Sequence, residues 1–170
     1  LAQKLRLLKA FGVNRTHGER NIPGDYDVVG LGYNYRMSEV HAAIGIEQMK
    51  KLPSFLQKRK ENFQALEAAL SGFDSFRILP QPINETLISS HYCMGILLKS
   101  NLIEKRPEIM DRLKSLGIGT SIYYPHPVPH MSYYRDRYGT IDCPNAELIS
   151  NSIIALPVGP HLVLDDMQTI

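Results

Sequence analysis

The sequence predicts an α/β fold in which a long helix leads into a small α/β domain. Two observations support this prediction. Residues 38–70 show apolar side chains at helical spacing over one long stretch, and residues 73–170 alternate short apolar runs with short helical patterns. The composition, 44% hydrophobic and 21% charged, is that of an ordinary globular domain. The longest apolar run falls well short of the roughly 20 residues that a membrane-spanning helix needs.

The chain opens on a pattern typical of an amphipathic helix, in which Leu5, Leu8 and Phe11 recur at helical spacing. The next segment, from Gly12 to Arg36, contains glycines and a proline and shows no sustained periodicity of apolar residues. A loop of this length inside a compact domain is usually functional or disordered. The chain starts without Met inside this first helix and stops soon after Asp165, the expected N-cap of a last helix. It is therefore expected to be a piece of a longer protein.

The long helix is expected to begin after Ser38, which is a favourable N-cap residue. Pro53 should kink or restart it, and Gly72 should end it. At 1.5 Å per residue the helix would be about 50 Å long, more than most helices of globular proteins. The apolar residues that define its first half are Val40, Ala43, Ile44 and Met49. We expect a strut that joins two parts of a larger protein.

Short elements fill the rest of the chain. Strands are predicted at 76–79, 92–99, 118–124 and 153–157, and helices at 107–117 and 144–152. The expected organisation is a remnant of a larger domain over 1–37, a linking helix over 38–72 and a small, truncated α/β domain over 73–170.

Charge and cysteine content exclude several classes of protein. The net charge is only +2 with dispersed charges, so neither nucleic acid nor an acidic membrane surface is an expected partner. The two cysteines, Cys93 and Cys143, fit a reduced cytoplasmic setting better than a disulfide scaffold.

A metal site is not expected. His126 and His130 have the i,i+4 spacing of some zinc ligands. Pro125, Pro127 and Pro129 prevent this segment from forming a helix, so the two rings need not share a face. No third ligand stands at a suggestive spacing.

Asn34 and Arg36 are the first candidate binding residues. An amide can donate to an oxyanion, a guanidinium matches a carboxylate or phosphate, and both residues precede a helix N-terminus. The alternative is that Asn34 satisfies a turn and Arg36 is a solvated surface charge. The local sequence by itself favours this alternative.

A second candidate is the segment 123–134, in which prolines are expected to fix an extended loop rich in Tyr and His. Such a loop could line a sugar pocket, where aromatic faces pack on sugar rings and polar groups bond hydroxyls. It could equally be a surface connection. The density of tyrosines and histidines favours binding modestly.

Three segments together resemble the DegT/DnrJ/EryC1/StrS family of pyridoxal-phosphate-dependent sugar aminotransferases. The first contains the motif G-x-N-Y-R-M-x-E, and the others are residues 116–134 and 144–162. The positions that match around the motif are Gly32, Asn34, Tyr35, Arg36, Met37, Glu39, Ala42, Ala43, Gly45 and Gln48. The resemblance covers essentially the whole chain in the family's order.

This resemblance implies the C-terminal part of a fold type I enzyme that uses pyridoxal 5'-phosphate. The family carries its cofactor-anchoring lysine and the acidic partner of the pyridine nitrogen upstream of the segment present here. No catalytic residue is therefore expected in this chain, and the chain alone is expected to be inactive. A homodimer with shared active sites is also implied.

The resemblance further assigns individual positions. Asn34 matches the asparagine that reaches the cofactor phosphate of the dimer partner. Arg36 is expected to clamp an anionic group of the substrate. Tyr123, His126 and His130 fall in the loop that approaches the sugar, although many members have His-Tyr where this chain has Tyr123-Tyr124.

The expected function is amination of a nucleotide-linked keto sugar with a glutamate-type amino donor. Two alternatives stay open. A sugar dehydratase of the same family would differ at the upstream lysine position. A non-catalytic module could serve dimerisation or sugar binding.

Overall fold

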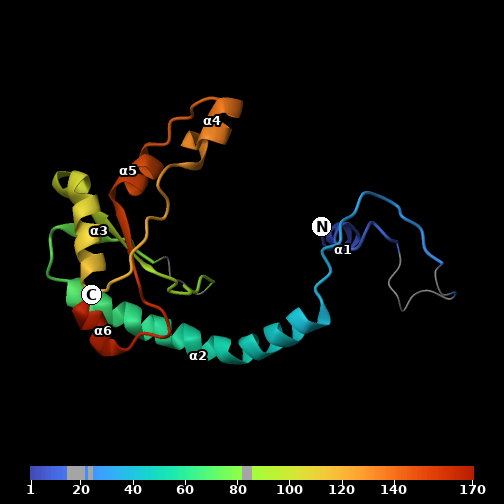
Figure 1. Cartoon of the computed structure of the whole chain (residues 1–170), viewed down its shortest axis with the longest axis horizontal. Helices are drawn as coiled ribbons and strands as arrows, with labels where there is room; N and C mark the ends of the chain where they lie inside the picture. Colours follow the sequence, from blue (N-terminus) through green and yellow to red (C-terminus); the bar gives the residue numbers. More distant parts are fainter. Residues whose placement is uncertain (15–21, 23–24, 82–85) are drawn as a thin grey trace. The chain divides into compact units, whose positions relative to one another are not determined.

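The computed structural model describes residues 1–14, 22, 25–81 and 86–170 (Figure 1). The chain divides into two compact units, an N-terminal unit, Leu1–Lys51, and a C-terminal unit, Leu52–Ile170. The division falls within the long helix α2, Glu39–Leu70. Within the described residues, no helix is both long and apolar enough to cross a membrane.

In the N-terminal unit a short helix pairs with a returning strand-like segment. Helix α1, Ala2–Leu8, is shorter than the apolar spacing indicated, because Phe11 lies beyond it with a positive φ of 62°. The chain around Ala10 then forms an antiparallel bridge with Asn34. Most of the predicted long loop between these two points, 15–21 and 23–24, lies outside the described residues.

Helix α2 confirms the predicted start. The Ser38 hydroxyl accepts a hydrogen bond from the His41 backbone N–H at 3.3 Å, as an N-cap does. The helix runs through Pro53 without the restart that the sequence suggested. Proline fixes φ near the helical value and removes one N–H donor, so a long helix can continue through it at a local cost.

The sheet of the C-terminal unit has three antiparallel strands in the order β1-β2-β3. Strand β1 is Phe76–Ile78, β2 is Met94–Leu98 and β3 is Ile153–Leu156. Central strand β2 pairs Ile96 with Ile78 of β1 and with Ile154 of β3. Three of the four predicted strands are thus confirmed.

The predicted strand at 118–124 is wrong. Only Ser121 pairs there, exchanging two backbone hydrogen bonds with Ala155 of β3 at 2.8 and 3.2 Å. Beyond it the chain enters the proline-rich segment that begins at Pro125. Prolines cannot donate to a ladder, so the pairing stops after one bridge.

Among its described residues, the C-terminal unit also contains six short helical segments. The predicted helices at 107–117 and 144–152 are confirmed, whereas η2 and α4 were not predicted. Their bounds are η2 Ser100–Lys105, α3 Arg106–Ser115, η3 Val128–His130, α4 Ser132–Tyr138, α5 Pro144–Ser152 and α6 Leu164–Thr169. The prediction of Asp165 as the last N-cap is wrong. Helix α6 starts two residues earlier, at a Val163 cap whose N–H donates to the Asp166 carboxylate at 2.8 Å.

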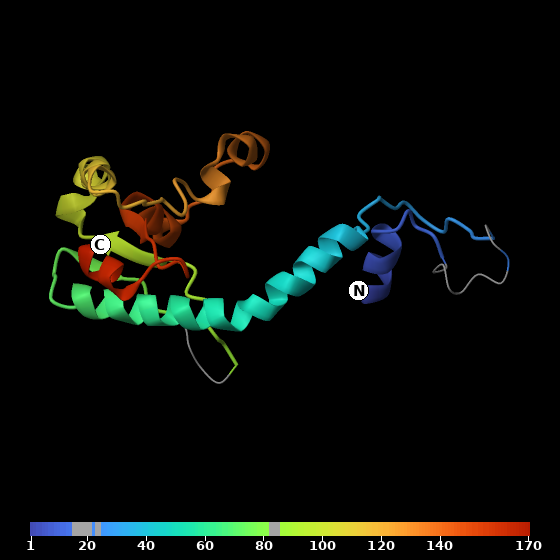
Figure 2. The ribbon, with the colours of Figure 1, turned by 60° about the horizontal axis from the view of Figure 1, so that its bottom comes forward.

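The core of the C-terminal unit forms where the second half of α2 meets the sheet and α6 (Figures 1 and 2). Leu66 of α2, Met94 of β2 and Met167 of α6 are almost fully buried in one cluster. The first half of α2 buries no residue, although it carries the apolar side chains Val40 and Ile44. The helix thus has a packed half and a half whose apolar side chains are exposed.

His91 is a buried histidine from which we expect a pH dependence of the stability of the C-terminal unit. Its ring is buried, its centroid lies 4.9 Å from that of Phe63, and its Nδ1 has no hydrogen-bond partner among the residues that the structure describes. Burial, followed by the positive charge of Lys60, lowers the pKa of His91 below its ordinary value of 6.5, while Glu67 opposes the shift. The unfolded chain therefore binds a proton at a higher pH than the folded chain does.

We expect the free energy of unfolding to fall as the pH drops through 6.5, because protonation favours the unfolded state. Urea unfolding of the protein at several pH values between 8 and 5 would measure this. His91→Gln should flatten the dependence relative to the wild type. An equal pH slope in both proteins would contradict the assignment.

Candidate functional site

Asn34 stands at a corner whose backbone is fixed on both sides. The Tyr33 N–H donates to the Leu8 carbonyl at 2.6 Å, and the Tyr35 N–H donates to the Lys9 carbonyl at 2.9 Å. The Asn34 side chain is exposed and has no hydrogen-bond partner among the described residues. The corner therefore presents an amide that no described residue occupies, on a backbone held by hydrogen bonds on both sides.

Glycines make this corner possible. A Cβ added at Gly32 would lie 1.9 Å from the Gly12 backbone nitrogen, and one added at Gly12 would lie 1.9 Å from the Gly30 carbonyl oxygen. Gly12 also has a φ of +69°. Only glycine permits this close approach of two backbones, so the two segments are held in contact.

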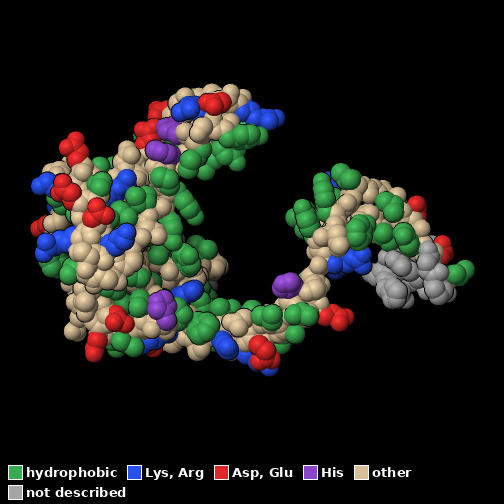
Figure 3. Space-filling view, viewed as in Figure 1, with side chains coloured by type: hydrophobic (Ala, Val, Ile, Leu, Met, Phe, Trp, Pro, Cys, Tyr) green, Lys and Arg blue, Asp and Glu red, His purple; other side chains and the backbone are tan. Residues whose placement is uncertain are grey.

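Aromatic contacts orient Arg36. Its guanidinium carbon lies 4.9 Å from the centroid of the Phe11 ring, in a cation–π arrangement. The Tyr33 and Tyr35 rings stack on each other at 5.3 Å on either side of Asn34 in sequence. The Arg36 side chain is exposed, so its N–H donors stay available to an anion. Figure 3 shows that hydrophobic side chains gather over this unit; Leu31, Tyr33, Tyr35 and Met37 are among the exposed ones.

The other candidate residues do not share one pocket. Tyr123 lines a cavity in the C-terminal unit, whereas neither His126 nor His130 is among the described residues that line it. His126 is exposed. The Nε2–H of His130 donates to the Ile141 carbonyl at 2.8 Å, and its Nδ1 lies 3.5 Å from a Glu147 carboxylate oxygen. The ring of His130 thus ties the 128–130 turn to α5, and its role in binding sugar stays a prediction.

The expectation of an extended loop over 123–134 is wrong in its second half. The chain forms the short helix η3 at 128–130, and α4 begins at Ser132. Proline is well tolerated in the first turn of a helix, where its missing N–H would have no partner. Proline-rich sequence therefore did not exclude these turns.

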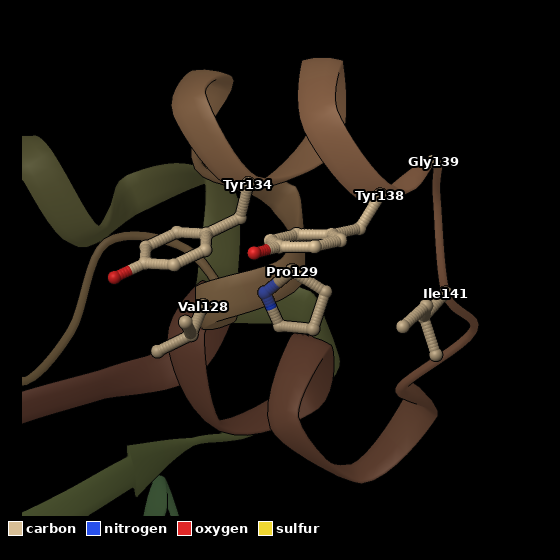
Figure 4. Close-up of a pocket in the computed structure, with 6 residues that line it drawn as sticks. All are labelled: Val128, Pro129, Tyr134, Tyr138, Gly139 and Ile141. Atoms are coloured by element: carbon tan, nitrogen blue, oxygen red, sulfur yellow. The ribbon is translucent and has the colours of Figure 1, made fainter.

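Helix α4 and η3 enclose a small apolar pocket of about 140 Å³. Figure 4 shows the rings of Tyr134 and Tyr138 beside each other over Pro129. The lining residues are Val128, Pro129, Tyr134, Tyr138, Gly139 and Ile141. None of these described lining residues is charged, so the pocket could hold an apolar group but offers no charged partner to a ligand.

The larger cavity, about 320 Å³, lies between α2, the start of β2 and the chain after β3. The described residues that line it are Arg59, Tyr92, Cys93, Gly119, Thr120, Ser121, Tyr123, Ala155, Leu156, Pro157, Val158, Gly159, Pro160 and His161. The hydrogen bond with Tyr123 is the main cause that raises the pKa of Tyr92, and burial raises the pKa of the Cys93 thiol. Both side chains are therefore held in their neutral forms at neutral pH.

Sequence reasoning missed the polar residues of this cavity other than Tyr123. Arg59 lies on α2 one helical turn before Asn62, which is buried but is not among the described residues that line the cavity. An arginine beside a buried position of an otherwise apolar face is a sequence signal for Arg59. Among the described residues, no group of three or more His, Cys, Asp or Glu side chains could hold a metal ion.

Comparison with known proteins identifies the relatives of this chain. A Campylobacter jejuni subsp. jejuni (serotype O:2) protein, UDP-4-amino-4,6-dideoxy-N-acetyl-beta-L-altrosamine transaminase, is 31% identical over 170 residues. This match covers 99% of the chain but only 43% of that relative. The chain thus spans less than half the length of this curated relative.

Solved structures show the same fold. Helicobacter pylori PseC, an aminotransferase involved in the biosynthesis of pseudoaminic acid, superposes with a TM-score of 0.83 at 24% identity, over 97% of this chain and 42% of that one. The aminotransferase TlmJ from Streptoalloteichus hindustanus gives 0.82 at 25% identity, over 99% and 42%. The model of the DegT/DnrJ/EryC1/StrS aminotransferase family matches residues 1–170, and the chain belongs to this family.

Proposed function

We propose that this chain is the C-terminal segment of a pyridoxal-phosphate-dependent enzyme that aminates a nucleotide-linked keto sugar. The amino group would come from a glutamate-type donor. The observation that carries the proposal is the free amide of Asn34 on its fixed corner, within a chain that matches the aminotransferase family throughout. The sugar transaminase from Campylobacter supports the substrate class.

The segments would take the following roles. Residues 1–37 would belong to the large cofactor-binding domain, and residues 73–170 would form the small domain. Residues 38–72 would form the helix that links these two domains. The exposed apolar side chains on the first half of α2, such as Val40, Ile44 and Met49, support burial against a further part of the enzyme or a second copy. Both cysteines are free, which supports a cytoplasmic enzyme.

The residues present fit the phosphate of pyridoxal 5'-phosphate. Asn34 offers two N–H donors that no described residue occupies, and its backbone is anchored to Leu8 and Lys9. When bound, the cofactor supplies an electron sink for the reaction. In a homodimer Asn34 would donate to the phosphate held by the partner subunit. Arg36, oriented on Phe11, would bind an anionic group of the substrate.

Asn34→Ala tests this proposal in the full-length enzyme. Loss of a hydrogen bond to a charged phosphate should weaken cofactor binding by about 1–3 kcal/mol. The dissociation constant of pyridoxal phosphate, measured by equilibrium dialysis, reports the change. Asn151→Ala, at an exposed position of α5, is the control and should bind cofactor like the wild type. Unchanged affinity in Asn34→Ala would refute the phosphate contact.

A further inference from the structure

Arg59 carries a positive charge that no described carboxylate neutralises. Its side chain is partly buried at the wall of the 320 Å³ cavity, and its Nε has no hydrogen-bond acceptor among the described residues. The guanidinium carbon lies 5.8 Å from the centroid of the Tyr92 ring, a cation–π contact that does not supply a carboxylate partner. A buried donor without an acceptor is unfavourable, so an anion in the cavity would be stabilised there.

The rest of the cavity suits an anion with a short carbon chain. Neither Asp nor Glu is among its described lining residues. Hydroxyl groups come from Thr120, Ser121 and Tyr123, and apolar surface comes from Leu156 and Val158. A volume of about 320 Å³ is at the small end of the range for ligand sites, which matches a molecule of amino-acid size.

The walls of the cavity are fixed before any ligand binds. The Asn62 amide donates to the Gly159 carbonyl at 2.9 Å and to the Leu162 carbonyl at 3.2 Å, which ties the chain after β3 to α2. A Cβ at Gly159 would lie 2.5 Å from the His161 ring, so glycine lets that ring fold back over the chain. The bridge between Ser121 and Ala155 fixes the opposite wall. A preorganised site loses less entropy on binding.

We infer that this cavity binds the carboxylate of a small, amino-acid-sized ligand through the Arg59 guanidinium. A carboxylate matches one guanidinium fork, and the apolar wall would hold the carbon chain. Identification of this ligand with the amino donor rests on the function proposed above. The carboxylate site itself rests only on the cavity.

Isothermal titration of the full-length protein with glutarate tests the site directly. Glutarate has two carboxylates and no amine, so it cannot act as an amino donor. 1,5-Pentanediol, with the same carbon chain and no charge, should give no measurable heat. Arg59→Met should weaken glutarate binding roughly 10- to 100-fold, since a charge-assisted pair is lost. Arg59→Lys should bind with intermediate affinity, because it keeps the charge without the fork.

Arg112→Met is the matched control, since Arg112 is an exposed helical arginine on α3 of the same unit. It should bind glutarate like the wild type. Equal affinity of the wild type and both Arg59 variants would overturn the inference, as would tight binding of the diol. A different result would be that inorganic phosphate binds to the wild type more tightly than glutarate does, and that Arg59→Met weakens its binding. In that case the site would be a phosphate site and the carboxylate assignment would be wrong.

The glutarate titration tests the carboxylate site independently of the proposed function. Glutarate binding through Arg59 in a protein without aminotransferase activity would retain the site and refute the function. Conversely, if the protein were an active aminotransferase and its affinity for glutarate were unchanged in the Arg59 variants, the proposed function would stand and the carboxylate site would be refuted.

Discussion

Gly32→Ala should disrupt the corner that carries Asn34 and release the cofactor more than Asn34→Ala does. The new Cβ would lie 1.9 Å from the Gly12 nitrogen and 2.2 Å from the Phe11 carbonyl carbon, and both are backbone atoms. The clash cannot be relieved by a rotamer change, so the two segments must separate. We expect a local cost of roughly 3 kcal/mol or more. Hydrogen exchange at the Tyr33 and Tyr35 amides, together with the cofactor dissociation constant, would measure it.

Gly30→Ala is the control for this prediction. A Cβ at Gly30 would meet no atom within 4 Å, although Gly30 is only two residues from Gly32 in the sequence. It should leave both the amide protection and the cofactor affinity unchanged. Wild-type protection of the two amides in Gly32→Ala would show that the corner is looser than the structure has it.

Leu66→Ala should cause the largest loss of stability in the C-terminal unit. Leu66 is 0% exposed and joins α2 to Met94 of the sheet and Met167 of α6 in one cluster. Truncation of a fully buried leucine costs about 2–5 kcal/mol, through lost transfer energy and the cavity left behind. Urea unfolding, with a lower midpoint and an unchanged slope, would report the change.

Gln64→Ala lies on the same helix at an exposed position and should alter the free energy of unfolding by less than about 0.5 kcal/mol. If Leu66→Ala were as stable as this control, the second half of α2 would not be part of the core.

Local sequence patterns were sufficient to predict most of the strands and the starts of three helices. The apolar runs at β1, β2 and β3 are confirmed, as are the Ser38-capped start of α2 and the proline in the first turn of α3 and of α5. These elements follow from side-chain periodicity and from cap or proline preferences. The prediction of a strand at 118–124 failed because only Ser121 pairs with β3 before the proline-rich segment begins at Pro125.

For the candidate site, the motif identified Asn34 and Arg36, but it could not show what holds them. The close approach of Gly12 to Gly30 and Gly32 and the contact of Arg36 with Phe11 join residues from both sides of a long loop. Local sequence favoured Asn34 as a turn residue and Arg36 as a solvated charge. In the structure the backbone alone makes the turn, and the amide is left free.

The sequence by itself determined the family, the long helix and the position of the motif, because each is written in residue types and spacing along the chain. Only the tertiary structure decided that Arg59 lies on a cavity whose described lining holds no counter-charge. That property depends on Tyr92, Ser121 and His161, which come from distant parts of the chain. An arginine is costly to bury and ordinary on a surface, and its sequence neighbours do not reveal which environment it has.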